Sequence, residues 1–96
     1  MNSQSSQVYL LVNIQPGKER EFANEVLSKG LIIDPEVEKI NFVHGSFDFV
    51  VMLHGPMADI ERRIIEIRKS PFVRSTQSLV AFAMFTWEDF SSQVEK

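Results

Sequence analysis

Apolar side chains alternate with polar or smaller neighbours along four segments of the chain and recur every three or four residues along two others. Alternation with a period of two, in runs rich in β-branched and aromatic residues, is typical of β-strands. The four strand-like segments are residues 8–14, 37–44, 47–54 and 72–85. A spacing of three or four is typical of an amphipathic helix. One such pattern begins near Pro16 and stops at Gly30, and the second begins at Met57 and stops before Pro71.

The predicted order of elements is therefore β-α-β-β-α-β, which is the ferredoxin-like α+β arrangement. In this fold a four-stranded antiparallel sheet carries both helices on one face. If the other face meets water, the residues that point to it are expected to be polar. Here it does not, because Val50 and Met52 lie on it in the third strand and Tyr9 and Leu11 in the first. The pattern predicts that another protein chain covers this face, in a sheet-to-sheet dimer.

A second interpretation of the apolar face involves the end of the chain. Residues 86–96 have the pattern of a possible short helix, in which Trp87, Phe90 and Val94 share one side. This C-terminal extension could fold back over the sheet, although about eleven residues are too few to cover a whole interface. Both arrangements could hold at once.

The composition fits one small domain. The chain has 96 residues, of which 44% are hydrophobic, and we assign residues 8–85 to the domain and residues 1–7 to a flexible polar tail. That tail has no basic and apolar signal-peptide pattern, and cysteine is absent, so we expect a cytoplasmic protein with no membrane association. A net charge of −3 disfavours direct DNA binding, which needs a concentrated basic face.

The sequence does not support an enzyme, a metal site or a bound cofactor. No serine, histidine and acid arrangement follows a known catalytic pattern. The two histidines, His44 and His54, fall near opposite ends of neighbouring strands, so they are not expected to share a metal. The glycines are isolated at the ends of predicted elements and form no phosphate-binding loop.

Polar residues inside apolar strands are the better candidates for function, because a buried polar group needs a partner. Asp48 follows the turn formed by Gly45, Ser46 and Phe47, and Thr76 and Ser78 lie two residues apart on one face of the last strand. A carboxylate that faces an ammonium, with hydroxyls and turn amides that hold a carboxylate, would suit an α-amino acid. The alternative is structural: Asp48 accepts hydrogen bonds from the turn amides, and the two hydroxyls belong to an exposed strand.

Three stretches resemble a known family: VYLLVNIQPGKEREFANEV, PEVEKINFVHGSFDFVVML and SPFVRSTQSLVAF. In order and spacing they are similar to the effector-binding and oligomerisation domain, or RAM domain, of the Lrp/AsnC (feast/famine) transcription regulators. The most specific part is the turn Gly-x-Tyr/Phe-Asp, which is Gly45-Ser46-Phe47-Asp48 here. The resemblance covers about residues 8–82. It implies the same fold, pairing through the sheets, and homo-oligomers of higher order such as octamers.

The resemblance also implies an amino-acid effector that binds between subunits. Carried over residue by residue, it identifies as ligand-binding Gly45, Ser46, Phe47, Asp48, Thr76 and Ser78. Full-length family members place a helix-turn-helix before this domain, which a seven-residue tail cannot form. We therefore expect a stand-alone form whose partners include DNA-binding Lrp/AsnC relatives. The connection at residues 28–35 is longer than in the family, and the C-terminal extension is additional.

Two alternatives belong to other functional classes. Dimeric α+β barrels of this fold include cofactor-independent and haem-degrading oxygenases, for which Asn13, Trp87 and a histidine would be the catalytic candidates. The third possibility is a purely structural oligomer whose pocket stays empty.

Overall fold

The computed structural model describes residues 6–28, 37–82 and 87–94 of the chain. The elements, in order, are β1 (Ser6–Ile14), α1 (Glu19–Ser28), β2 (Val37–Phe42), β3 (Phe49–Gly55), α2 (Met57–Arg68), β4 (Val73–Ala81) and α3 (Trp87–Val94). The predicted βαββαβ order is confirmed. The expected connection at residues 28–35 and the helix stop at Gly30 lie outside the described residues, except for Ser28 itself.

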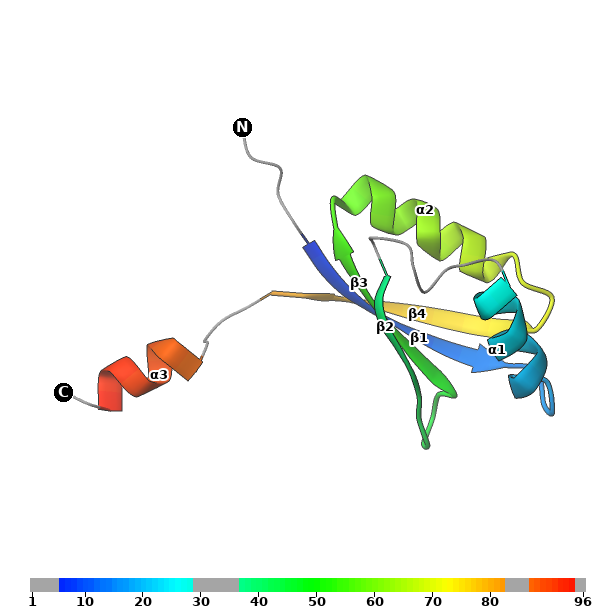
Figure 1. The fold of residues 1–96 in the computed structure, drawn as a ribbon, viewed down its shortest axis with the longest axis horizontal. Helices are drawn as coiled ribbons and strands as arrows, with labels where there is room; N and C mark the ends of the chain where they lie inside the picture. Colours follow the sequence, from blue (N-terminus) through cyan, green and yellow to red (C-terminus); the bar gives the residue numbers. More distant parts are fainter. Residues whose placement is uncertain (1–5, 29–36, 83–86, 95–96) are drawn as a thin grey trace.

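The four strands form one antiparallel sheet in the order β2-β3-β1-β4 (Figure 1). The first and third strands are central, and β2 and β4 are the edges. In the central pair Leu10 lies opposite Val51 and Val12 lies opposite Phe49. Paired residues in a sheet point to the same face, so the apolar positions of the two strands add up to one continuous surface.

Both helices pack on that surface, and together they enclose the core. The central strands contribute Val8, Leu10, Val12, Ile14, Phe49, Val51 and Leu53, and all of these are buried. The amphipathic pattern predicted from Met57 onward is confirmed on α2, because Ile60, Ile64 and Ile67 are buried against the sheet. On α1, Phe22 and Val26 are buried and the ring of Phe22 lies 5.1 Å from that of Phe49.

One large apolar residue of α1 is not buried. Leu27, which directly follows the buried Val26, is 60% exposed. At about 100° of rotation per residue, position 27 is about 140° away from position 22 around the helix axis. The helix therefore buries only a narrow stripe of residues spaced one turn apart, and Leu27 lies outside this stripe.

A polar contact ties α1 to the connection between α2 and β4. Ser70 is the one buried polar residue among those described, and its hydroxyl donates a hydrogen bond to Oε1 of Glu25 on α1. The same hydroxyl oxygen accepts a hydrogen bond from the amide of Phe72 at 3.2 Å. Because both polar functions of this side chain are satisfied, the sharp turn before Pro71 can pack beneath α1 without a buried unpaired group.

The face of the sheet without helices carries an apolar surface, as the sequence predicts. Tyr9 and Leu11 on β1 lie opposite Met52 and Val50 on β3, and Leu79 on β4 lies opposite Tyr9. We call these five residues the open-face patch. In Figure 1, α3 lies past the end of β4 and apart from the sheet, so this helix does not cover the open-face patch. In the described part of the chain, no helix has the length and apolar character to cross a membrane.

Candidate ligand-binding site

The turn between β2 and β3 is the most specific element of the candidate site. The amide of Val43 donates to the carbonyl of Asp48 at 2.9 Å and closes the loop. Gly45 has a φ of +135°. A Cβ at this position would meet no atom within 4 Å, so the backbone conformation, rather than lack of space, favours glycine here. Gly45 and Ser46 are exposed and Phe47 is half-buried, which leaves the turn accessible to a ligand.

The carboxylate of Asp48 is held by β1 rather than by the turn. Its Oδ2 accepts a hydrogen bond from the backbone amide of Ile14 at 2.8 Å, and its own amide donates to the carbonyl of Val12 at 2.9 Å. The strand pairing of β1 with β4 is irregular between Asn13 and Ile14. The structural alternative, in which Asp48 accepts hydrogen bonds from the turn amides, does not match this arrangement. The donor to its Oδ2 is the amide of Ile14 on β1. No local pattern in the sequence could identify Ile14 as that donor.

The second oxygen of Asp48 is available for another partner. Among the described residues, Oδ1 accepts no hydrogen bond from the protein. A carboxylate with one oxygen fixed by a backbone amide and the other unoccupied has a defined orientation and retains an acceptor for an ammonium or amide donor.

The hydroxyl-bearing residues of β4 lie on one face, as predicted. Thr76 is opposite Val12 and Ser78 is opposite Leu10 in the strand register. Both partners point into the core, so the two hydroxyl side chains are on the helix-bearing face, at the outer edge of the sheet. Thr76 is half-buried and Ser78 is exposed.

The structure does not bring the two halves of the predicted site together within one chain. Asp48 lies beside β1 on the side of β3, whereas Thr76 and Ser78 are on β4, on the other side of β1. The backbones of these residues are two strand spacings apart, which is about 10 Å. The strand order therefore does not place the two hydroxyls beside the carboxylate of Asp48.

Sequence reasoning missed a pocket close to Thr76. It has a volume of about 250 Å³ and is lined by Arg68 at the end of α2 and by Val73, Arg74, Ser75 and Thr76 at the start of β4. The clustering of two arginines around SPFV is visible in the sequence, but only the fold shows that both line one cavity. Ser75 also accepts a hydrogen bond from Nδ2 of Asn13 at 3.3 Å.

The residues named for an oxygenase do not converge. Asn13 lies at the end of β1 where β4 begins, and Trp87 lies beyond the opposite end of β4. His44 and His54 are both exposed, and the ring of His44 is edge-on to Phe42 at 5.5 Å. Within residues 6–28, 37–82 and 87–94, no group of three or more potential metal ligands is found.

The fold has counterparts among solved structures. The protein FFRP-DM1 is 29% identical, with a TM-score of 0.65, over 80% of this chain and 99% of its own. A regulator of the AsnC family from Agrobacterium tumefaciens is 16% identical, with a TM-score of 0.66, over 88% of this chain and 54% of its own. The chain has the fold of the Lrp/AsnC regulators.

The resemblance of the sequence to the Lrp/AsnC effector-binding domain is thus confirmed at the level of the fold. A third Lrp/AsnC-like structure is a transcriptional regulator from Neisseria meningitidis in complex with L-Met. It is 18% identical, with a TM-score of 0.65, over 84% of this chain and 52% of its own. The chain therefore spans about half the length of the two longer regulators and nearly the whole length of FFRP-DM1. No protein-family model matches the sequence, and neither does any curated protein.

Proposed function

We propose that this chain is a non-enzymatic, amino-acid-sensing and oligomerising module of Lrp/AsnC-type transcription regulation. The observation that carries the proposal is the arrangement of Asp48. One carboxylate oxygen is fixed by the amide of Ile14, the other is available, and the Gly45–Phe47 turn beside it is accessible. The complex of the Neisseria meningitidis regulator with L-Met supports an amino acid as the class of ligand.

The effector binds between subunits in this proposal. The hydroxyls that suit an amino-acid carboxylate are on the far side of β1 from Asp48, so the complementary hydroxyls come from a second copy. Asp48 contacts the ammonium, Gly45, Ser46 and Phe47 form one wall, and Thr76 and Ser78 of the neighbouring copy contact the carboxylate. Such an arrangement makes ligand binding depend on assembly, which is the property that a sensing module needs.

The open-face patch provides a separate surface for assembly, because Thr76 and Ser78 lie on the helix-bearing face and not within this patch. Five apolar side chains on an uncovered sheet face are the kind of surface that soluble proteins bury against a partner. A second copy of the same chain presents the same patch, so a two-fold axis can cover both at once. Further contacts would then build larger oligomers, including mixed assemblies with DNA-binding Lrp/AsnC relatives. With a net charge of −3, this chain is not expected to bind DNA by itself.

Calorimetric titration with each of the twenty amino acids tests the proposal, followed by Asp48→Asn with the amino acid that binds. Asparagine keeps an oxygen for the amide of Ile14 but removes the charge that attracts an ammonium. A hydrogen bond to a charged group contributes about 1.5–3 kcal/mol, so affinity should fall by about tenfold or more. Glu38→Gln, an equal charge change at an exposed position on β2, is the control and should leave affinity unchanged.

A mixing experiment tests whether the site spans two subunits. Asp48→Asn and Thr76→Val should each bind weakly alone. If Asp48 and Thr76 of one site come from different copies, unfolding and refolding the two variants together should restore wild-type affinity in about a quarter of the sites of a two-fold dimer. If both residues of a site come from one copy, mixing restores none, and the intersubunit proposal is wrong. If no amino acid binds, the remaining interpretation is a purely structural oligomer.

A further inference from the structure

The pocket between the end of α2 and the start of β4 is lined almost entirely by hydrogen-bond donors. Its lining includes two arginines, Arg68 and Arg74, and two hydroxyl-bearing residues, Ser75 and Thr76. Among the described residues, the apolar one in the lining is Val73. No carboxylate of the described residues lines the pocket, so the two arginines bring two positive charges to it and no described side chain brings a negative one.

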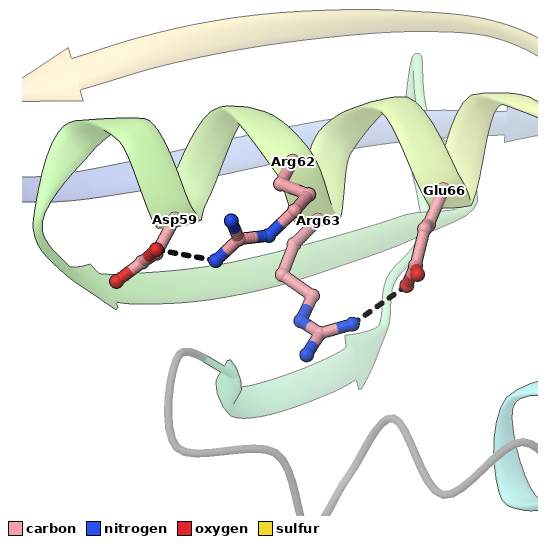
Figure 2. A network of polar contacts seen from close by, with 4 residues as sticks. All are labelled: Asp59, Arg62, Arg63 and Glu66. Atoms are coloured by element: carbon pink, nitrogen blue, oxygen red, sulfur yellow. Dashed lines mark hydrogen bonds and ion pairs between the residues drawn. The ribbon is translucent and has the colours of Figure 1, made fainter.

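The two arginines of the pocket differ in their ion pairing from Arg62 and Arg63 on α2. Figure 2 shows Arg62 paired with Asp59 and Arg63 paired with Glu66, each three residues apart on the helix. In the part of the chain that the structure describes, neither Arg68 nor Arg74 forms an ion pair or a hydrogen bond through its side chain. Their charge is therefore not neutralised by any described residue and can act on a ligand.

The irregular start of β4 places Arg74 at this pocket. Ser75 pairs with Asn13 and Val73 pairs with Ile14, so Arg74 is an extra residue between two regular pairs. A β-bulge of this kind commonly redirects a side chain next to a binding site. Here it lies where β4 meets the last residue of α2, and the two arginines reach one cavity from different elements.

Thr76 adds a hydroxyl on the helix-bearing face, whereas Ser75 pairs with Asn13 and its hydroxyl lies toward the opposite face of the sheet. The oxygen of Ser75 accepts from Asn13 at 3.3 Å, which leaves its proton free to be donated. Thr76 has no hydrogen-bond partner for its hydroxyl among the described residues. The C-terminal end of α2 acts in the opposite sense, because its partial negative charge amounts to about half of an elementary charge. Two full positive charges outweigh it.

We infer that this pocket binds the oxyanion group, a carboxylate or a phosphoryl group, of a small metabolite. A guanidinium matches the paired oxygens of either group, and two of them favour a ligand with two negative charges. The pocket lies within one chain and is formed without a second copy. It shares Thr76 with the proposed amino-acid site, but it does not rest on that proposal, because Asp48 takes no part in it.

Titration of the full chain with succinate and with inorganic phosphate tests the inference, with neutral succinamide as the uncharged analogue. Saturable binding of succinate, of phosphate or of both is expected, and it identifies the preferred oxyanion; succinamide should not bind. Arg68→Gln and Arg74→Gln should each weaken binding about tenfold, as expected for loss of a charge-assisted hydrogen bond. Arg74→Lys keeps the charge but not the planar fork, and its affinity should be intermediate.

Arg62→Gln is the matched control, because it removes the same charge from the same helix outside the pocket. Its affinity should equal that of the wild type. Failure of both anions to bind, or equal weakening by Arg62→Gln and Arg68→Gln, would overturn the inference. Asp48→Asn should leave anion binding intact, so failure here and failure of the amino-acid proposal are separate results. Arg62, Arg68 and Arg74 are exposed and Asp48 is half-buried, and thermal unfolding will confirm that each variant is folded.

Discussion

Substitution of Val50 by aspartate tests whether the open-face patch is the surface on which two copies associate. Val50 lies on the central strand β3, opposite Leu11 on β1 and Asn41 on β2. Neither of these cross-strand partners is a cation. An aspartate at this position would therefore have no cation directly opposite it in its own sheet, and dimerisation would bury its charge against an apolar surface.

The expected effect on the dimer is large. Burial of a valine side chain contributes about 1.5–3 kcal/mol, and a two-fold dimer contains the substitution twice, so the apolar loss amounts to about 3–6 kcal/mol. This corresponds to an increase of about 10²- to 10⁴-fold in the dissociation constant. Desolvation of an unpaired carboxylate costs several kcal/mol more for each ion, which makes this range a lower bound.

Met52→Asp provides an internal comparison on the same face. Met52 lies opposite Lys39 on β2, so an aspartate there can pair with an ammonium in the same sheet. It should weaken the dimer less than Val50→Asp does. The control for a general effect of added charge is Ile65→Asp, at a position on α2 that is already 53% exposed. This variant should associate like the wild type.

Sedimentation equilibrium at micromolar concentrations measures the result against the chain mass of 11.0 kDa. The wild type should be at least dimeric, and Val50→Asp should be a folded monomer by circular dichroism. A monomeric wild type, or a Val50→Asp variant that stays dimeric, would show that the open-face patch is not the interface. Dissociation by Ile65→Asp to the same extent would place the contact on the helices instead.

Two further predictions concern stability. Phe22→Ala should lower the free energy of unfolding by about 3–5 kcal/mol, because Phe22 is buried against Phe49, whereas Leu27→Ala on the exposed side of α1 should change it by less than about 0.5 kcal/mol. Denaturant titration checks both, and equal effects would contradict the assigned face of α1. Ser70→Ala should cost about 1–3 kcal/mol, because it leaves the buried contact to Glu25 unmade. Thermal unfolding checks it, and an unchanged midpoint would mean that the hydroxyl does not stabilise the turn.

The sequence by itself determined the elements and their two-sided character. Alternation along residues 8–14 and 47–54 assigned Val12 and Val51 to the core and Leu11 and Val50 to the opposite face, because side-chain direction in a strand follows from position alone. The hairpin was also predictable, although its strands end at Phe42 and resume at Phe49 rather than meeting at the glycine. Strand ends depend on hydrogen bonds with other strands, which a local pattern does not contain.

Only the tertiary structure decided which polar residues meet. Asp48 and Thr76 looked like parts of one site because both interrupt apolar strands, but the strand order places β1 between them. The donor to Asp48 is Ile14, 34 residues away in the chain, and it is a backbone amide that any residue except proline would supply. In the same way, Arg68 and Arg74 line one pocket because a helix end and an edge strand converge there. Sequence patterns report which face a residue occupies, whereas the distance between two faces or two strands is set by how the sheet is ordered and how the helices pack on it.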